Sequence, residues 1–582
     1  MQRDWLKHYP PGVPETIDAS AYESLVALMD EAFERHAKLA AYKFMGSSYS
    51  FRDVDEMATA FAAYLQAQGL VKGDRVALMM PNVPQYPVAV AGVLLAGLVV
   101  VNVNPLYTPR ELEHQLRDSG ASAIVIFENF AHVLQKCLGS LPILASASIS
   151  NVGSKTSRRI IVTGAGDLLG LLKGSIVNLV VRRVKKLVPA YELPGSVRFN
   201  RAVATGRSSS FARPSIGRED IAVIQYTGGT TGVSKGAVLL HRNLVANVLQ
   251  SQKWNEPAFR AEPGTLAQPI RPEDNNVVCA LPLYHIFAFT VNMMLSLRQG
   301  SCTILIPNAR DIKAVLKELK RHRFHTFPAV NTLFNALTNH PDFDSVDWSH
   351  LKLSVGGGSS VQQATAKVWL ARTGCAICEG YGLSETSPSA ACNPTDSKAY
   401  TGTIGMPLPS TDFKLIDDAG KEVAPGAYGE IAIKGPQVMA GYWNRPEDTE
   451  SVMTADGFLR TGDIGAVDER GYFRIVDRKK DMVLVSGFNV YPNEIEDVVS
   501  QMPGVLECAV VGVPDEKTGE AVRLVIVKRD ATLTESAVRA YCVDNLTGYK
   551  RPRVIEFRDT LPKTPVGKIL RRELRQPVKQ PA

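Results

Sequence analysis

A loop rich in glycine and hydroxyl side chains occupies residues 226–236 of the 582-residue chain. It reads Tyr-Thr-Gly-Gly-Thr-Thr-Gly-Val-Ser-Lys-Gly, with three glycines within five positions. Glycine lets the backbone turn so that N–H groups converge on an anion, and the hydroxyls and Lys235 add further donors. A Walker A loop is excluded, because Ser234 precedes Lys235 and Gly236 follows it. The loop predicts a polyphosphate-binding site, with an unliganded surface turn as the alternative.

Further clusters of side chains that could take part in chemistry follow in a fixed order. Residues 379–386 combine an aromatic ring, a hydroxyl and a carboxylate, and residues 460–463 end on an aspartate. The others are Tyr442-Trp443, residues 477–481, residues 486–488 and residues 561–568. Together this ordered set resembles the adenylate-forming superfamily of acyl-CoA synthetases, firefly luciferases and nonribosomal peptide adenylation domains. Residues 102–108, 281–287 and 485–492 are most similar to those of bacterial long-chain fatty-acyl-CoA synthetases.

The resemblance implies a two-step ligase that uses ATP, coenzyme A and Mg²⁺. A long-chain fatty carboxylate attacks the α-phosphorus of ATP to give an acyl-adenylate and pyrophosphate, and the thiol of coenzyme A then displaces AMP. The enzyme must neutralise phosphate charge and exclude water. Such a reaction serves fatty acid degradation or uptake.

The resemblance also implies roles for individual residues. Lys568, Glu385 and Ser384 are the expected catalytic residues: Lys568 reaches the α-phosphate and the attacking carboxylate, Glu385 binds Mg²⁺, and Ser384 contacts the α-phosphate. The family more often has threonine at position 384. Tyr381 is expected to stack on adenine, Asp463 to accept the ribose hydroxyls and Arg478 to contact ribose or phosphate. The nucleotide-binding residues expected in full are Tyr226, Thr227, Gly228, Gly229, Thr230, Thr231, Gly232, Val233, Ser234, Lys235, Gly236, Ala237, Tyr381, Asp463 and Arg478.

A mobile lid is implied because Lys568 cannot stay over the phosphate while a thiol attacks the acyl carbon. The family rotates its C-terminal domain about a hinge, which corresponds here to Lys480. That rotation brings the loop of Ser486, Gly487 and Phe488 against the thiol route, where Gly487 leaves room for the pantetheine arm. For the acyl chain we expect His285 at the entrance and Gly356, Gly357 and Gly358 beside the tail, although these glycines equally fit a tight turn.

The elements that must position these residues are typical of an α/β fold. Apolar runs at residues 75–80, 123–127, 221–225 and 351–355 predict strands that alternate with helices. Residues 402–477 change to short strands and turns, which predicts a small β-rich subdomain. The resemblance implies a large N-terminal domain, residues 1–477, that binds AMP and the acyl group, and a small α+β lid, residues 478–582.

Bulk composition is that of a globular protein, and the cysteines and the N-terminal segment lead us to expect a cytoplasmic location. The chain is 45% hydrophobic and 21% charged, with a net charge of +7, and shows no nucleic-acid-binding module. Eight scattered cysteines give no disulfide framework. The N-terminal segment lacks the apolar core of a secretory signal. The apolar stretch at residues 88–101 is too short to span a membrane, so we expect a buried helix followed by a strand.

Residues 168–187 combine apolar positions at helical spacing with a basic end. The apolar residues recur at 169, 172, 176, 179, 180 and 187, and Arg182, Arg183, Lys185 and Lys186 cluster at one end. This pattern fits a helix in peripheral contact with the cytoplasmic side of the inner membrane, and equally a core helix with a solvated basic end. A homodimer is also left open.

Two other functions remain as alternatives. One is adenylation with delivery of the acyl group to a carrier protein or to oxygen. The other is a non-catalytic lipid or nucleotide sensor, which the complete set of Lys568, Glu385, Asp463 and Arg478 disfavours, because a sensor does not need all four.

Overall fold

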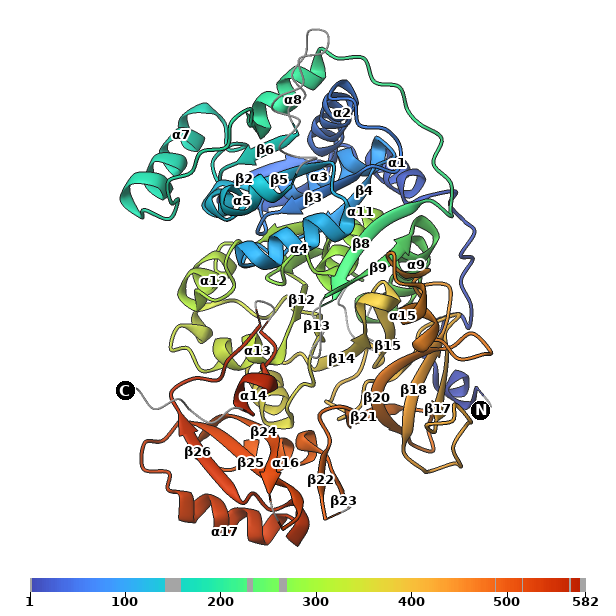
Figure 1. Cartoon of the computed structure of the whole chain (residues 1–582), viewed down its shortest axis with the longest axis vertical. Coiled ribbons are helices and arrows are strands. Elements are labelled where there is room, and N and C mark those ends of the chain that lie inside the picture. Colours follow the sequence, from blue (N-terminus) through green and yellow to red (C-terminus); the bar gives the residue numbers. More distant parts are fainter. Residues whose placement is uncertain are drawn as a thin grey trace.

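The computed structural model describes residues 3–141, 159–227, 234–260, 269–486, 488–515, 517–564 and 567–575. Its large domain contains two mainly parallel sheets and one antiparallel sheet, and the C-terminal residues form a fourth sheet at one end of the elongated molecule (Figure 1). The predicted α/β class is therefore confirmed, with a β-rich subdomain and a small C-terminal α+β domain.

The first sheet has eight strands in the order β19-β9-β8-β4-β3-β5-β6-β7. From β8 to β7 all neighbouring strands are parallel. Beyond β8, β9 and then β19 extend the sheet through antiparallel pairing. Its strands are β3 (Arg75–Met79), β4 (Val99–Asn102), β5 (Ala123–Phe127), β6 (Ile160–Thr163), β7 (Val197–Arg198), β8 (Ile221–Thr227), β9 (Lys235–Leu240) and β19 (Gly441–Tyr442).

The second sheet has nine strands in the order β16-β15-β14-β13-β12-β10-β11-β1-β2. Its central strands are parallel and almost wholly buried, as expected for strands covered on both faces. Its strands are β1 (Ala40–Phe44), β2 (Ser47–Ser50), β10 (Asn276–Cys279), β11 (Cys302–Leu305), β12 (Thr326–Ala329), β13 (Leu353–Gly356), β14 (Ile377–Gly382), β15 (Ser389–Cys392) and β16 (Met406–Pro407).

The helices of the large domain form where capping residues and apolar faces agree. Ser50 with Asp53, and Thr108 with Glu111, make reciprocal capping boxes at the starts of α2 and α4. Its helices are α1 (Leu25–Arg35), α2 (Phe51–Ala67), α3 (Gln85–Leu95), α4 (Pro109–Ser119), α5 (Ala131–Cys137), α7 (Leu171–Leu179), α8 (Phe199–Arg207), α9 (His241–Asn255), α10 (Ile286–Ala288), α11 (Leu295–Gln299), α12 (Ile312–Leu319), α13 (Asn331–Thr338), α14 (Gln363–Thr373) and α15 (Pro446–Ser451).

Helix α3 and strand β4 account for the apolar stretch at residues 88–101. Every residue of α3 is buried, and all four residues of β4 lie inside the first sheet. The expected buried helix and strand are thus confirmed. Within the described residues, no helix is both long and apolar enough to cross a membrane.

The β-rich subdomain is an antiparallel sheet in the order β17-β18-β20-β21. Its last strand ends at Arg478, which pairs in register with Asp463. Both of these predicted site residues therefore belong to one rigid sheet. The strands are β17 (Asp412–Ile416), β18 (Gly429–Lys434), β20 (Leu459–Val467) and β21 (Phe473–Arg478).

The C-terminal domain, which we call the lid, packs helices on a five-stranded sheet. A separate apolar core built on Val483, Ile495 and Leu524 holds it together. Its strands are β22 (Val483–Val485), β23 (Phe488–Val490), β24 (Val505–Asp515), β25 (Gly519–Lys528) and β26 (Val554–Arg558), and its helices are α16 (Pro492–Ser500), α17 (Glu535–Asn545) and the short α18 (Arg571–Leu574).

Candidate active site

A cavity of about 1520 Å³ lies where the large domain, the β-rich subdomain and the lid meet. Strands β8, β13 and β14 point their carboxyl ends at it, the edge where α/β sheets bind ligands. The predicted site residues that line the cavity are Tyr226, Thr227, Ser234, Lys235, His285, Gly357, Gly358, Tyr381, Ser384, Glu385, Asp463, Arg478, Lys480 and Lys568.

The glycine-rich loop joins β8 to β9, and its residues 228–233 lie outside the described part of the chain. Thr227 and Lys235 face each other across this hairpin. The Lys235 Nζ lies 2.6 Å from Asp448 Oδ1 and 5.3 Å from the ring centre of Tyr442. Lys235 is therefore held at the cavity wall by Asp448 and Tyr442, to neither of which the sequence analysis assigned a role.

Two predicted residues of this loop lie behind the cavity wall. A Cβ on Gly236 would stand 2.6 Å from the Ile224 side chain, so only glycine fits this close approach. Ala237 is fully buried on β9. These two residues support the hairpin from below.

Tyr381, Asp463 and Arg478 meet at one end of the cavity. The Tyr381 hydroxyl donates to Asp463 Oδ2 at 2.6 Å, and the Arg478 Nε lies 3.2 Å from Asp463 Oδ1. Attraction to the Asp463 carboxylate raises the pKa of Arg478 above its usual value. The arrangement offers an aromatic face beside a carboxylate whose orientation is fixed from two sides.

Glu385 lies on a single 3-10 turn, Ser384–Thr386, just after β14. Its carbonyl accepts from the Met439 N–H at 2.8 Å, and its Oε1 accepts from the Tyr442 hydroxyl at 2.7 Å. No group of three or more acidic, histidine or cysteine side chains able to hold a metal occurs among the described residues. One carboxylate is nevertheless sufficient for Mg²⁺ that is held mainly by substrate phosphates, so the residues present fit that ion.

Lys568 reaches the cavity from the lid on a loop that is docked on the large domain. The Gly567 carbonyl accepts from Thr332 Oγ1 at 3.2 Å, and the Lys568 N–H donates to Thr564 Oγ1 at 3.0 Å. Gly567 has a φ of 84°, and a Cβ there would stand 2.7 Å from Thr332 Oγ1. Burial, reinforced by the positive charge of Arg478, lowers the pKa of Lys568 to about 8.

The space beside Lys568 is apolar and narrow. His285, Phe287 and Gly358 border a small cavity of about 10 Å³ next to the lysine. Burial and the nearby Lys568 ammonium lower the pKa of His285 to about 3, so this imidazole is neutral. Gly357 lies against the Phe287 ring, where a Cβ would stand at 2.9 Å, whereas Gly356 packs on Val361 and Ile377 behind the wall.

The hinge region carries a cluster of charged groups around Arg571. Its guanidinium lies 2.8 Å from Glu496 Oε2, 3.7 Å from Asp477 Oδ1 and 3.6 Å from Asp481 Oδ2. Lys480 lines the cavity, and burial lowers its pKa. The segment that carries Lys568 is thereby tied to both sides of the predicted hinge.

The predicted thiol-route residues are away from the cavity in this arrangement. Ser486 and Phe488 lie on the β22–β23 hairpin, and neither lines the cavity. Phe488 is exposed and stacks on Tyr549, with ring centres 4.8 Å apart. Gly487 lies outside the described residues.

The sequence analysis assigned no role to three residues that contribute to the site. Tyr442 orients Glu385, and Asp448 pairs with Lys235. Glu379 accepts from the Val361 N–H and the Tyr400 hydroxyl at 3.0 Å each, and burial raises its pKa to about 8. The sequence showed only that Tyr442 and Glu379 belong to the clusters noted above. It could not show their pairings, because their partners are distant in sequence.

Comparison with known proteins assigns the chain to a class. Residues 29–443 match the AMP-binding enzyme family, and residues 494–568 match the AMP-binding enzyme C-terminal domain. The chain therefore belongs to the AMP-binding enzyme family, as its sequence motifs predicted.

Individual relatives indicate which AMP-binding enzymes this chain is similar to. The chain is 51% identical to the long-chain-fatty-acid–CoA ligase of Escherichia coli O157:H7 over 576 residues, which cover 99% of this chain and 98% of the relative. It is 52% identical to the enzyme of the same name from Yersinia pestis, with the same coverage. Among solved structures, it resembles the anthranilate CoA ligase AuaEII in complex with anthranoyl-AMP, with a TM-score of 0.82, 26% identity and coverage of 96% and 98%. ATP-bound MatB from Rhodopseudomonas palustris aligns with a TM-score of 0.78, 30% identity and coverage of 94% and 98%.

Proposed function

We propose that this chain is a long-chain-fatty-acid–CoA ligase that works through an acyl-adenylate. The observation that supports this most strongly is the convergence of Tyr381, Glu385, Asp463, Arg478 and Lys568 on one cavity. These residues come from four separate segments, and one of them reaches in from the lid. The names of the relatives from Escherichia coli and Yersinia pestis supply the class of acid.

In the first half-reaction, a carboxylate oxygen of the acid bonds to the α-phosphorus of ATP, and the bond from that phosphorus to pyrophosphate breaks. Lys568 offsets the negative charge that builds up on the pentacoordinate phosphorus. Ser384 contacts the α-phosphate, while Tyr381 and Asp463 hold adenine and ribose. The residues from Thr227 to Lys235 wrap the β- and γ-phosphates.

Glu385, together with the phosphates, would hold the Mg²⁺ that accompanies ATP. The ion would neutralise charge on the polyphosphate. The Tyr442 hydroxyl donates to one oxygen of the Glu385 carboxylate, and Glu385 lines the cavity.

In the second half-reaction, the thiol sulfur of coenzyme A bonds to the acyl carbon and AMP leaves. Lys568 fills the approach to the adenylate in the present arrangement, so the lid has to turn about Lys480 first. Ser486, Gly487 and Phe488 then face the thiol route. His285, Gly357 and Gly358 border the acyl group, and Phe287 moves aside to admit a long tail, because the space of about 10 Å³ beside it is too small.

The product serves fatty acid degradation or uptake, and the enzyme works in the cytoplasm in peripheral contact with the inner membrane. This location is favoured by the substrate, since long-chain acids partition into bilayers.

The test is to measure AMP release and loss of free thiol together, with purified protein, Mg-ATP, coenzyme A and acids from short to long. We expect AMP and thioester in equal amounts, with the fastest turnover for long acids. Release of AMP or pyrophosphate without loss of thiol would indicate another acyl acceptor. No turnover with any acid would overturn the proposal.

A further inference from the structure

Six large apolar side chains are exposed on one short segment, residues 171–187. The first two, Leu171 and Leu172, are 94% and 78% exposed. No other segment of this length in the described ranges exposes more than two such side chains, so this is a concentrated surface. Its apolar residues are Leu171, Leu172, Ile176, Leu179, Val184 and Leu187. We call this surface the α7 face.

The segment is α7 followed directly by a π-helical turn, Val180–Val184, at the outer edge of the large domain (Figure 1). Its inner side packs on the main core through Val177 and Val181. The interpretation of this segment as an ordinary core helix is therefore wrong for its outward leucines. Leu172, Ile176 and Leu179 follow helical spacing on the outer side.

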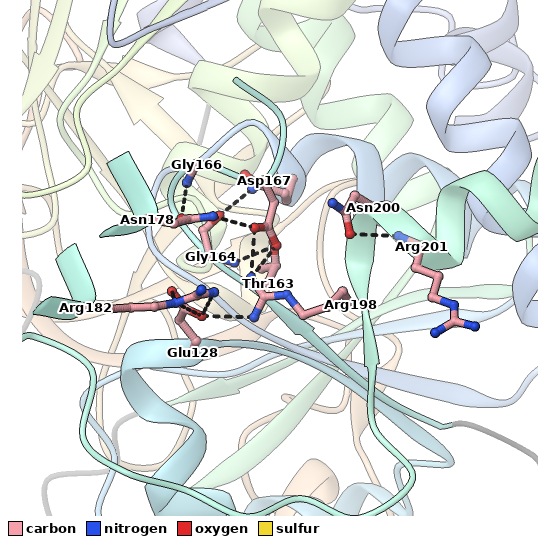
Figure 2. A network of polar contacts seen from close by, with 11 residues as sticks. Glu128, Thr163, Gly164, Gly166, Asp167, Asn178, Arg182, Arg198, Asn200 and Arg201 are labelled. Carbon is pink, nitrogen blue, oxygen red and sulfur yellow. Dashed lines mark hydrogen bonds and ion pairs between the residues drawn. The ribbon is translucent and has the colours of Figure 1, made fainter. Parts of the chain in front are cut away.

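A buried polar network fixes this orientation (Figure 2). Glu128, whose side chain is 1% exposed, pairs with Arg182 at 2.7 Å and with Arg198 at 2.9 Å. Asp167 pairs with Arg198 at 2.7 Å and accepts from Asn178 Nδ2 at 3.0 Å. Rotating the helix to bury its leucines would take Arg182 from Glu128 and Asn178 from Asp167. Two buried carboxylates would then share only the guanidinium of Arg198, which is unfavourable.

Contacts at the first turns of α7 add to this anchoring. The Gly174 backbone lies so close to Gly166 that a Cβ on Gly174 would stand 2.2 Å from the Gly166 oxygen. The Lys173 Nζ reaches the Met45 carbonyl and, at 3.0 Å, Ser47 Oγ. The apolar face is thus a fixed surface feature and not a frayed helix.

The charges around the face have one sign. Residues 168–191 contain no aspartate or glutamate. Arg182 is engaged with Glu128, but Arg183, Lys185 and Lys186 are exposed and form no ion pair with any described residue. An apolar face beside three unpaired cations complements the interface of an anionic bilayer, where acyl chains lie beneath phosphate groups.

We infer that the α7 face docks the enzyme on an anionic lipid bilayer, with its leucines among the acyl chains and its cations at the lipid phosphates. Only the biological benefit, access to long-chain acids in the bilayer, rests on the proposed function. The α7 and π-helical segment is 14 residues long, Leu171–Val184, short of the ~20 needed to span, so it lies along the interface.

Sedimentation of the full chain with lipid vesicles tests this inference. We expect binding to phosphatidylcholine vesicles that contain phosphatidylglycerol, and little binding to phosphatidylcholine alone. Reversing Arg183, Lys185 and Lys186 to glutamate should lower the partition coefficient ~100-fold. Arg182 is left intact, because replacing it would break the network with Glu128. Leu172→Glu combined with Ile176→Glu should abolish binding although the cations at the basic end are unchanged.

Matched controls lie on α14, where Lys367 and Val368 are also exposed. Lys367→Glu and Val368→Glu should leave vesicle binding unchanged. Thermal unfolding of every variant establishes that the fold is intact. Because the readout is binding to vesicles and not turnover, the test is independent of the proposed function.

Depth of insertion provides a second measurement. The fluorescence of the tryptophan in Leu172→Trp should be quenched by phosphatidylglycerol vesicles with brominated acyl chains. The fluorescence of the tryptophan in Val368→Trp should not be quenched. The inference is overturned if the wild-type chain does not bind anionic vesicles, or if the α7 variants bind as well as the wild type. Concentration-dependent self-association that the α7 variants lose, without vesicle binding, would instead assign the face to a second copy of the chain.

Discussion

Lys568 must carry a charge for the proposed action on phosphate, yet its surroundings oppose that charge. Burial and Arg478 lower its pKa to about 8, so the ammonium form is lost as pH rises through that value. We therefore expect kcat/KM for ATP, measured as pyrophosphate release, to be level below pH 8 and to fall above it, since this ratio reports on groups of the free enzyme.

Two substitutions at this position separate charge from other effects. Lys568→Arg should move the alkaline fall to higher pH, because a guanidinium stays protonated. Lys568→Ala should slow adenylate formation ~100-fold or more while sparing thioester formation from supplied acyl-adenylate. An unchanged alkaline limb in Lys568→Arg would show that another group titrates there.

Tyr442 is expected to act through Glu385 rather than on the substrate. Its hydroxyl donates to the carboxylate at 2.7 Å, a bond to a charged group that typically contributes about 1.5–3 kcal/mol. Tyr442→Phe should therefore lower the adenylation rate about tenfold or more and raise the Mg²⁺ concentration needed for half-maximal rate. Tyr472→Phe, which removes a hydroxyl outside the cavity lining, is the control. An unaltered Mg²⁺ requirement in Tyr442→Phe would remove this positioning role.

At the scale of elements, the sequence predicted what local patterns determine. The apolar runs of β3, β5 and β8 formed close to their predicted positions, because burial on both faces leaves an unbroken hydrophobic signal. The pairing of Tyr442 with Glu385 joins residues 57 positions apart and depends on how β19 packs against β9. Periodicity carries no information on such pairings. The outward leucines of α7 were ambiguous for the same reason, since Glu128 and Asp167 orient that helix from elsewhere in the chain.

Helix α18 is expected to stabilise the lid through Arg571, three residues after Lys568. Asp477 is fully buried, and its pKa is raised to about 7 by burial despite the nearby guanidinium. Arg571→Ala leaves Asp477 and Glu496 without their cation. The free energy of unfolding for the first transition in denaturant should therefore fall by about 3–5 kcal/mol. Adenylation should fall as well, because the Lys568 segment loses its anchor.

Arg572 is the matched control for this prediction. It lies next to Arg571 on the same helix, is exposed, and forms no ion pair with any residue that the structure describes. Arg572→Ala should leave the denaturant midpoint unchanged. Equal midpoints for Arg571→Ala and the wild type would show that the cluster does not stabilise the lid.

At the scale of the whole molecule, the lid holds Lys568 in the cavity, the orientation that the proposed first half-reaction requires. Besides the Thr332–Gly567 contact, the Asn335 Nδ2 lies 3.3 Å from the Leu506 carbonyl, which joins α13 of the large domain to β24 of the lid. Rotation of the lid must separate these two elements. All eight native cysteines are buried, and position 335 is buried too while the lid is docked, so a thiol introduced there reacts when the lid opens.

Bridging Asn335→Cys and Leu506→Cys with a short bismaleimide should therefore hold the enzyme at the first half-reaction. We expect the bridged protein to form one equivalent of acyl-adenylate and then stop, with no thioester on addition of coenzyme A, because Lys568 cannot leave the phosphate. Each single-cysteine variant treated with the same reagent should complete both steps. If the bridged enzyme makes thioester at the rate of these controls, then the thiol reaches the acyl carbon without movement of the lid, and the hinge at Lys480 has no part in turnover.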